Sequence, residues 1–447
     1  MNSKQEQMKS KPIFPLLVSM AIPMMFSMLI QSLYNIVDSI FVARLGNDAL
    51  TAVSLVFPLQ NLVIAIAVGF GIGVSSCISI NLGSKNVERA SQAASVGIVL
   101  SIVHSVLFVI FGILVTKPFL RMFSSSETIV DMGTKYGYIV LCLAFGALIQ
   151  VCIEKIFQAL GEMNVTMVVL AAGAIINIIL DPILIFGKFG FPAMGVTGAA
   201  VATVIGQISG LVLYLIILAY KKIPLKISMR NVHFDKKLIK QLYSVGIPSS
   251  IMMSLPSVLV SVLNGLLVKF SETHVSVLGI YYKLQTFIYL PANGIVQGMR
   301  PIVGYNYGAK QTDRLHKTLR MSLMFTATIM FIGTVLSLFI PSQILGLFNA
   351  DSAMLEIGVP ALRIICLGFL ISTFGIIYSG AFEALGLGVQ SLLISLLRQF
   401  IIIIPLSFIL TKFIGATGIW VSFPISEIIA AIVAIILMKK TLKQINR

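Results

Sequence analysis

Two aspartates lie inside stretches of this sequence that are otherwise uncharged. Asp38 and Asp181 each stand alone in a run of more than 20 residues without another charge. A charge at the centre of a bilayer costs at least about 2.5–3.5 kcal/mol, so such residues usually serve a function. Asn35 stands three residues before Asp38 and Asn177 four before Asp181, and these helical spacings bring each amide close to its aspartate. These residue types predict a site for a proton or a hard cation, which prefers oxygen ligands.

The composition places these residues in a membrane. The chain has 447 residues, of which 57% are hydrophobic and 11% charged, whereas about a quarter of a soluble domain is charged. A helix needs about 20 mostly apolar residues to cross a bilayer. The sequence therefore predicts an all-α polytopic membrane protein with twelve spans, at 14–43, 50–81, 91–115, 135–158, 165–187, 194–219, 241–268, 276–305, 318–340, 357–382, 388–411 and 414–438.

The two halves of the sequence repeat each other. A shift of 225 residues aligns Gly69 with Gly294, Gly73 with Gly298, and "FQALG" at 157–161 with "FEALG" at 382–386. Six spans per half is an even number, so both halves cross the membrane in the same direction. Parallel repeats of this kind form two bundles around a shared cavity in several transporters, and the bundles rock to give alternating access. We predict an N-lobe at 1–220, a cytoplasmic basic linker at 221–240 and a C-lobe at 241–447.

The net charge of +16 reflects topology. Of the lysines and arginines in the tails, in the loops and at the ends of the spans, 20 fall on the side of the chain ends and 7 on the other side. Cytoplasmic loops carry this excess, so both termini are expected in the cytoplasm. No basic stripe with interleaved aromatic residues suggests nucleic-acid binding, and the basic segments are expected to contact anionic lipid.

No motif predicts an enzyme or a resident cofactor. The segment "VGFGIGV" at 68–74 lies inside an apolar helix. Small residues at such spacing bring membrane helices close together. The sequence has no nucleotide-binding loop, zinc motif or Ser/His/Asp set. An ion gradient is therefore the expected energy source.

The two aspartates are expected at matching depth. Asp38 lies about 9 Å before the outer end of its helix and Asp181 about 10 Å before the outer end of its own, at 1.5 Å per residue. Thr203 falls at a similar depth on the returning helix. Asp38, Asn35, Asn177, Asp181 and Thr203 thus form the predicted coupling site, with Asp38, Asn177 and Asp181 as metal ligands if the ion is Na⁺. Pro182 removes a backbone hydrogen bond and is the predicted hinge.

The second half has no acidic counterpart of Asp38 or Asp181. Arg398 and Glu427 lie in neighbouring spans and are candidates for an ion pair. The roles of the other charges in the spans of this half remain open, including snorkelling of the long side chains to the membrane surface; they are Lys283, Arg300 and Arg363.

Several segments resemble the multidrug and toxic compound extrusion (MATE) family, with the bacterial multidrug efflux branch as the best match. They are "LYNIVDSIFVARLG", "NIILDPILIFG", "GVTGAAVATVIGQ" and "QGMRPIVGYNYGAK". The resemblance covers nearly the whole chain. It implies that the acid of helix 1 is Asp38, that the Asn and Asp of helix 5 are Asn177 and Asp181, and that the threonine of helix 6 is Thr203, with Thr197 as the alternative. Acids that some members carry inside helices 7 and 10 are absent from these predicted spans.

The resemblance also implies a function. The chain is expected to be a monomeric antiporter of the bacterial inner membrane that exchanges H⁺ or Na⁺ for small drugs or toxic organic cations, without a cofactor. The predicted substrate cavity comprises Met28, Gln31, Phe57, Gln60, Gln150, Lys283 and Phe287. One alternative is a flippase for lipid-linked oligosaccharides, in which Lys283, Arg300 and Arg363 would hold a pyrophosphate. The other is a scaffold that transports nothing.

Overall fold

Every regular element in the described part of the chain is helical. The computed structural model describes residues 3–228, 232–348 and 350–446. The first half forms α1 (Ser3–Ser10), α2 (Ile13–Ala43), α3 (Asn47–Gly83), α4 (Val87–Phe123), α5 (Glu127–Cys142), α6 (Phe145–Ala159), α7 (Met163–Phe186) and α8 (Val196–Tyr220). The second half forms α9 (Lys236–Leu267), α10 (Glu272–Gly308), α11 (Thr312–Phe339), α12 (Pro341–Gly346), α13 (Ser352–Ile365), the 3₁₀ turn η1 (Cys366–Gly368), α14 (Phe369–Ala384), α15 (Gly388–Leu396), the π-helical turn η2 (Leu397–Ile401), α16 (Ile403–Ile414) and α17 (Thr417–Ile445). The predicted all-α membrane fold is confirmed.

The spans agree with the sequence prediction except where helices break. Ten helical segments of the described chain are long and apolar enough to cross a bilayer, and the bent pair of α5 and α6 makes an eleventh. α10 is the twelfth candidate, because its bounds repeat those of α3 at the 225-residue shift. The predicted single span at 135–158 is two helices that meet at 42°. The predicted linker at 221–240 contains 229–231, which lie outside the described residues, and its last five residues belong to α9.

The internal repeat extends to the interruptions of the helices. α5 and α6 are separated at 143–144, and the corresponding helices α13 and α14 are separated by the 3₁₀ turn at 366–368. Neither break contains a proline. The two halves therefore repeat the position of the interruption, whereas the bend of 42° belongs to the first half and Ser352–Ala384 of the second half forms one span.

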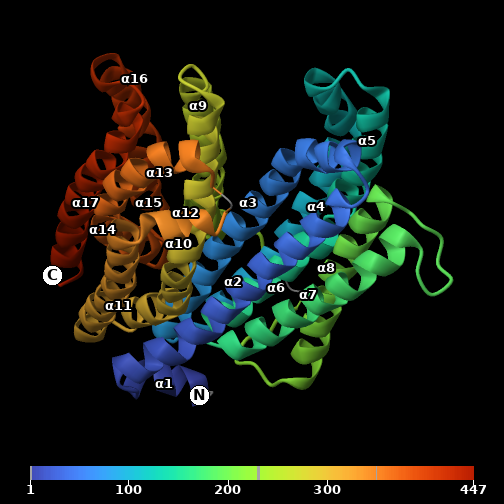
Figure 1. Ribbon diagram of the computed structural model, residues 1–447. Coiled ribbons are helices and arrows are strands. Elements are labelled where there is room, and N and C mark those ends of the chain that lie inside the picture. Colours follow the sequence, from blue (N-terminus) through green and yellow to red (C-terminus); the bar gives the residue numbers. More distant parts are fainter. Residues whose placement is uncertain (1–2, 229–231, 349, 447) are drawn as a thin grey trace.

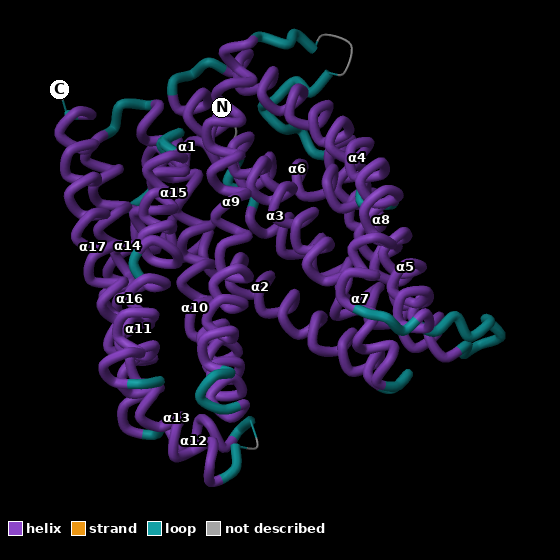
Figure 2. The backbone as a smooth tube through the Cα atoms, turned by 90° about the horizontal axis from the view of Figure 1, so that it is seen from above, coloured by secondary structure: helices purple, strands orange, loops and turns teal. Residues whose placement is uncertain are grey.

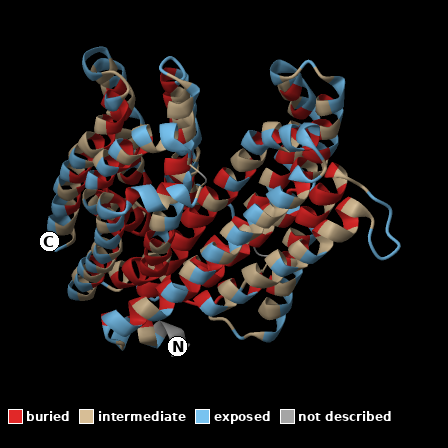
Figure 3. Cartoon of the chain, viewed as in Figure 1, coloured by how far each residue is buried: buried red, intermediate tan, exposed pale blue. Residues whose placement is uncertain are grey.

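The two halves meet near α1 and diverge toward the opposite side of the molecule (Figure 1). α3 packs against α9 and α2 packs against α10, and these four helices lie in the middle of the molecule, between α17 and α8 (Figure 2). Buried residues are concentrated where the halves meet (Figure 3). We call the side that holds α1 and the turns at 84–86 and 309–311 the terminal side.

Glycines allow the two halves to touch backbone to backbone. A Cβ atom on Gly73 of α3 would collide with the carbonyl oxygen of Leu242 in α9, and one on Gly298 of α10 would lie 2.7 Å from the Ala21 nitrogen in α2. Because Gly298 is the repeat of Gly73, the two contacts are related by the same pseudo-symmetry. The predicted close packing through these glycines is confirmed, and it closes the terminal side.

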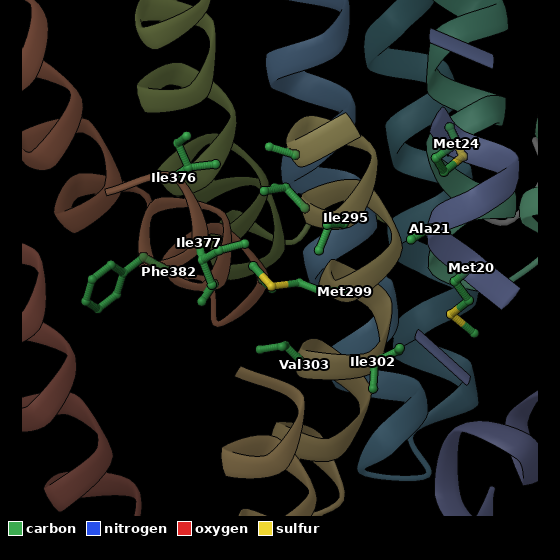
Figure 4. Close-up of a cluster of buried hydrophobic side chains, with 14 of the residues drawn as sticks. Met20, Ala21, Met24, Ile295, Met299, Ile302, Val303, Ile376, Ile377 and Phe382 are labelled. Carbon is green, nitrogen blue, oxygen red and sulfur yellow. The ribbon is translucent and has the colours of Figure 1, made fainter. Parts of the chain in front are cut away.

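Large apolar side chains fill the rest of this contact. Ala21 and Met24 of α2 and Ile295 and Met299 of α10 are buried, and Ile377 of α14 lies on the far side of α10 (Figure 4). Each buried Met or Ile side chain contributes about 1.5–3 kcal/mol relative to exposure. The helices that join the halves therefore also belong to the main hydrophobic core.

Two arginines reach across the halves on the terminal side. Arg89 of α4 lies 3.6 Å from the carboxylate of Asp235, just before α9. Arg314 of α11 donates hydrogen bonds of 2.9 and 2.8 Å to the carbonyl oxygens of Met8 and Lys11, just before α2. Arg314 is the repeat of Arg89. We call these two contacts the arginine clasps.

The outer faces of the helices are apolar, as expected for contact with lipid. α4 shows this most clearly, because its exposed residues follow the helical spacing of one face. Between 46% and 66% of each of these side chains is exposed: Val103, Val106, Leu107, Ile110, Ile113 and Leu114.

The glycine contact predicts a sharp difference between two positions of α10. Gly298→Leu should destabilise the protein by about 1–3 kcal/mol, because the added side chain overpacks the seam with α2. Gly279→Leu is the matched control, since a Cβ there meets no atom within 4 Å. Thermal unfolding of the purified proteins in detergent measures both, and equal melting temperatures would contradict the assigned seam.

Candidate ion-coupling site and central cavity

Four of the predicted site residues come together on three neighbouring helices. α7 carries Asn177 and Asp181 and packs against α2, which carries Asp38, and against α8, which carries Thr203. Asp181 is fully buried, Asn177 and Thr203 are 2% and 3% exposed, and Asp38 is half-buried. We call these four residues the acidic cluster.

Most buried polar atoms of the acidic cluster have no hydrogen-bond partner among the described residues. This applies to both carboxylate oxygens of Asp181, both amide atoms of Asn177 and one oxygen of Asp38. A buried polar group without a partner costs about 1–3 kcal/mol, and more if it is charged. Neither aspartate belongs to an ion pair in the described part of the chain. The acidic cluster therefore contains oxygen atoms that receive no hydrogen bond from the protein and are available to a bound ion.

Two tyrosines complete the surroundings of the cluster. The Asp38 and Asp181 carboxylates are near enough to repel each other, and Tyr34 interacts with both of them and with Thr203. Tyr136 of α5 is buried nearby. The sequence analysis missed both tyrosines. Tyr34 could have been found, because it lies four residues before Asp38 on the same helix face.

Glycines hold α7 and α8 close enough to form the cluster. A Cβ atom on Gly206 of α8 would lie 3.2 Å from the Asn177 Cβ and 3.0 Å from the Gly173 carbonyl oxygen. Nearer the C-terminal end of α7, a Cβ on Gly198 would lie 2.6 Å from the backbone of Leu184. Asn177 and Asp181 thus lie on a stretch of α7 fixed to α8 at both ends.

A central cavity of about 500 Å³ lies on the other face of α2. Met28, Gln31 and Asn35 of α2 form its wall on one side, and residues of α9, α10, α14, η2, α16 and α17 form the rest. Asn35 is exposed toward this cavity and is not one of the cluster residues. α2 is therefore shared by two places, since Asp38 faces the acidic cluster and Asn35 faces the cavity.

The family of the chain follows from a comparison with known protein families. The sequence model of the MatE family matches twice, over residues 23–183 and 248–409. Together these matches cover more than half of the chain. The chain belongs to the MatE family. The two matches start 225 residues apart, which is the shift of the internal repeat.

Individual MATE relatives cover nearly the full length. The multidrug export protein MepA of Staphylococcus saprophyticus is 25% identical over 439 residues, which are 97% of this chain and 96% of that protein. The probable multidrug resistance protein YoeA of Bacillus subtilis is 27% identical over 425 residues, or 94% of this chain and 92% of YoeA. These matches confirm the predicted membership in the bacterial multidrug branch.

Solved structures give the same result for the fold. The outward-facing structure of a multidrug resistance MATE family transporter superposes with a TM-score of 0.92 at 24% identity, covering 100% of this chain and 99% of that one. A MATE crystal structure in the straight conformation gives a TM-score of 0.93 at 25% identity, with the same coverage. The protein is thus a multi-pass membrane transporter of the MATE family and not an enzyme, as predicted.

In this MATE protein, only two of the seven residues predicted to form the substrate cavity line the central cavity. Met28 and Gln31 do. The side chains of Phe57, Lys283 and Phe287 are exposed elsewhere. The remaining two predicted residues contact neighbouring helices of the first half: Gln60 accepts a hydrogen bond of 3.5 Å from Tyr136, and Gln150 is buried against Gly210. None of these five is among the residues that line the central cavity.

Pro182 lies within α7, which continues as one helix from Met163 to Phe186. The helix therefore retains its hydrogen-bonded form on both sides of the proline. Its role as a hinge stays a prediction.

Two basic residues in the spans of the second half contact neighbouring helices. Arg300 forms an ion pair with Glu383, and Arg363 donates a hydrogen bond of 3.2 Å to the carbonyl oxygen of Leu338. The snorkelling considered for Arg300 is therefore wrong. Glu383 lies one residue beyond the predicted span 357–382, yet it is buried inside α14. The tenth predicted span, which ends in α14, thus contains a buried acid that its predicted boundary excluded.

A buried polar network that the sequence analysis missed lies between the cavity and the terminal side. Lys155 of α6 donates hydrogen bonds of 3.1 Å to Glu154 and 3.0 Å to Gln158. Gln158 in turn donates one of 3.4 Å to Gln297 of α10, in the other half. Two adjacent opposite charges in an apolar span were the available signal, and the network joins the halves below the cavity.

The unsatisfied Asp181 predicts a gain in stability from a neutral side chain. Asp181→Asn keeps the shape but removes the charge from the buried site, so the protein should be stabilised by at least about 1 kcal/mol. Thermal unfolding at a pH at which Asp181 is ionised measures this effect. Asp131→Asn is the control, because Asp131 is an exposed partner of Lys135 and should change stability by less than about 0.5 kcal/mol. A lower melting temperature for Asp181→Asn would show that the native carboxylate is satisfied.

Proposed function

We propose that this MATE protein is a monomeric multidrug antiporter of the bacterial inner membrane that exports amphipathic, often cationic, compounds in exchange for H⁺ or Na⁺. The observation that carries this proposal is the fully buried Asp181, whose two carboxylate oxygens have no partner among the described residues. A proton removes the charge of such a group, and a hard cation takes its oxygens as ligands. Binding of either ion at Asp181 is therefore energetically favourable.

The cluster suits a monovalent ion better than a resident metal. The described residues contain no group of three His, Cys, Asp or Glu side chains that could hold a metal ion. Two carboxylates, one amide and one hydroxyl offer a few oxygen ligands with at most two negative charges. In this proposal, Na⁺ would use Asp38, Asn177 and Asp181, and a proton would use Asp181 or Asp38.

α2 provides the coupling between ion and drug. Its Asp38 belongs to the acidic cluster, while Met28, Gln31 and Asn35 line the central cavity. Neutralising the cluster removes the repulsion between Asp38 and Asp181 and so changes how α2 packs against α7. Only an ion that binds two conformations unequally can shift their populations, and Pro182 is the proposed hinge for this shift.

The proposed direction of transport follows from the orientation. The excess of Lys and Arg on the side of the chain ends supports a cytoplasmic location for both termini. The halves diverge on the opposite side (Figure 1), so the cavity would face outward in this conformation, like the outward-facing MATE transporter to which the fold is similar. Ion binding from outside would then release the drug, and ion loss inside would permit loading from the cytoplasm or inner leaflet.

The substrate class is supported by the relatives and the cavity. The matching proteins include a multidrug export protein and a probable multidrug resistance protein. The cavity presents the rings of Tyr282, Tyr289 and Phe423 beside polar groups, which suits flat amphipathic molecules. The flippase alternative needs a shared cationic site. Lys283, Arg300 and Arg363 do not line this cavity, and this distribution weighs against a pyrophosphate site.

Ethidium efflux from energised membrane vesicles tests the proposal. The wild type, Asp38→Asn and Asp181→Asn are compared while the Na⁺ and H⁺ gradients are collapsed separately. Each variant should lose gradient-driven efflux by at least about tenfold, because a neutral amide cannot take and release the coupling ion. The gradient whose collapse stops the wild type identifies the ion.

Asp48→Asn is the control, because Asp48 is an exposed acid in the first turn of α3. Protein in the membrane is quantified for every variant. Wild-type efflux in both cluster variants would overturn the ion site, and no efflux even from the wild type would favour the flippase.

A further inference from the structure

Arg398 and Glu427 are the only charged side chains among the described residues that line the central cavity. They come from η2 and α17, both in the second half. The other lining residues are uncharged, and three of them present aromatic rings: Tyr282, Tyr289 and Phe423. The charge that a substrate meets in this cavity is therefore set by one ion pair.

The pair is closely matched in geometry. Arg398 Nε lies 2.8 Å from one Glu427 carboxylate oxygen and 3.1 Å from the other, and its Nη2 lies 2.7 Å from the second. The two side chains are 13% and 15% exposed. A two-pronged contact of this kind cancels both charges locally, yet both groups remain within reach of a molecule in the cavity.

The surrounding backbone is shaped to hold the pair. Arg398 lies in the π-helical turn Leu397–Ile401, and such turns are rare and are frequent at functional sites. A Cβ atom on Gly375 would lie 3.0 Å from the Arg398 side chain, and one on Gly368 would lie 3.4 Å from the Glu427 side chain. Each charged side chain therefore occupies space that a glycine leaves open beside it.

We propose that the Arg398–Glu427 pair determines which charge class of substrate the cavity accepts. Aromatic faces attract cations, so a neutral wall with three rings favours flat aromatic cations. An anion finds no free positive charge, because the guanidinium is already held by the carboxylate. Loss of Glu427 exposes the guanidinium and favours anions, whereas loss of Arg398 exposes the carboxylate and strengthens the preference for cations.

This inference rests on the proposed function, because it assumes that substrates bind in the central cavity. It adds a substrate class and a residue pair that lie apart from the acidic cluster. The pair is a specificity element and takes no part in ion coupling.

Equilibrium binding of two dyes to the purified full-length protein tests the inference without transport. Ethidium is a flat aromatic cation and fluorescein is a flat aromatic anion, and fluorescence polarisation reports both. The wild type should prefer ethidium. Glu427→Gln should weaken ethidium binding about tenfold and strengthen fluorescein binding, and Arg398→Gln should do the reverse, since tenfold corresponds to one modest charge interaction. The double variant Arg398→Gln/Glu427→Gln should restore the wild-type preference.

Two further variants keep the test decisive if a single variant does not fold. Thr286 lines the cavity and is exposed, so Thr286→Lys and Thr286→Glu add a charge without breaking the pair. They should act like Glu427→Gln and Arg398→Gln, respectively. Arg121→Gln is the control, because Arg121 forms an exposed ion pair with Glu127 in the other half.

Each outcome separates a specificity role from a structural one. Equal weakening of both dyes in the single variants, with an unchanged preference in both Thr286 variants, would overturn the inference. Charge-independent binding in a protein that still shows ion-driven efflux would overturn it and leave the proposed function intact. A reversed dye preference without any efflux would support it and overturn the transport proposal.

Discussion

A carboxylate that is shielded from water and receives no hydrogen bond is the constraint on which the rest of this structure depends. Asp181 can keep such a position only because α7 is fixed to α8 through Gly198 and Gly206, so the backbone cannot relax to expose it. The cost of burial is then offset by packing elsewhere, as is common at functional sites. The same rigidity makes the site responsive, because adding or removing one positive charge changes the local energy greatly in a medium of low dielectric.

α2 connects the acidic cluster to the central cavity and to the second half of the molecule. One of its faces belongs to the acidic cluster, another lines the central cavity, and its lower part packs against α10 of the other half (Figure 4). A change in how α2 packs on α7 therefore reaches the cavity and the contact between the halves through one rigid element. The second half contributes the neutral Arg398–Glu427 pair, and its described residues include no buried acid without a partner near the cavity. The two halves therefore have different roles on a repeated backbone.

Much of the fold and part of the site could be predicted from the sequence, because lipid imposes a simple rule on helix length and charge. Asp38 and Asp181 were found since a lone acid in an apolar run is conspicuous. Asn35, predicted for the cluster, lines the central cavity instead, and helix geometry gives the reason. At 100° per residue, a side chain three positions away is turned by about 60°, whereas one four positions away is turned by about 40° to the other side. Asn177 and Tyr34 have the second spacing. The bend between α5 and α6, the π turn at Arg398 and the Arg300–Glu383 pair depend on contacts between distant helices, which no local pattern contains.

The arginine clasps help to keep the terminal side closed to ions. Arg89 belongs to the first half and holds the segment that leads into α9, while Arg314 belongs to the second half and holds the segment that leads into α2. Each half thus secures the leading segment of the other. If only one clasp breaks, the other still joins the halves at that side. A passage toward the chain ends therefore requires the loss of both clasps, and this requirement protects the membrane against a leak that would dissipate its ion gradient.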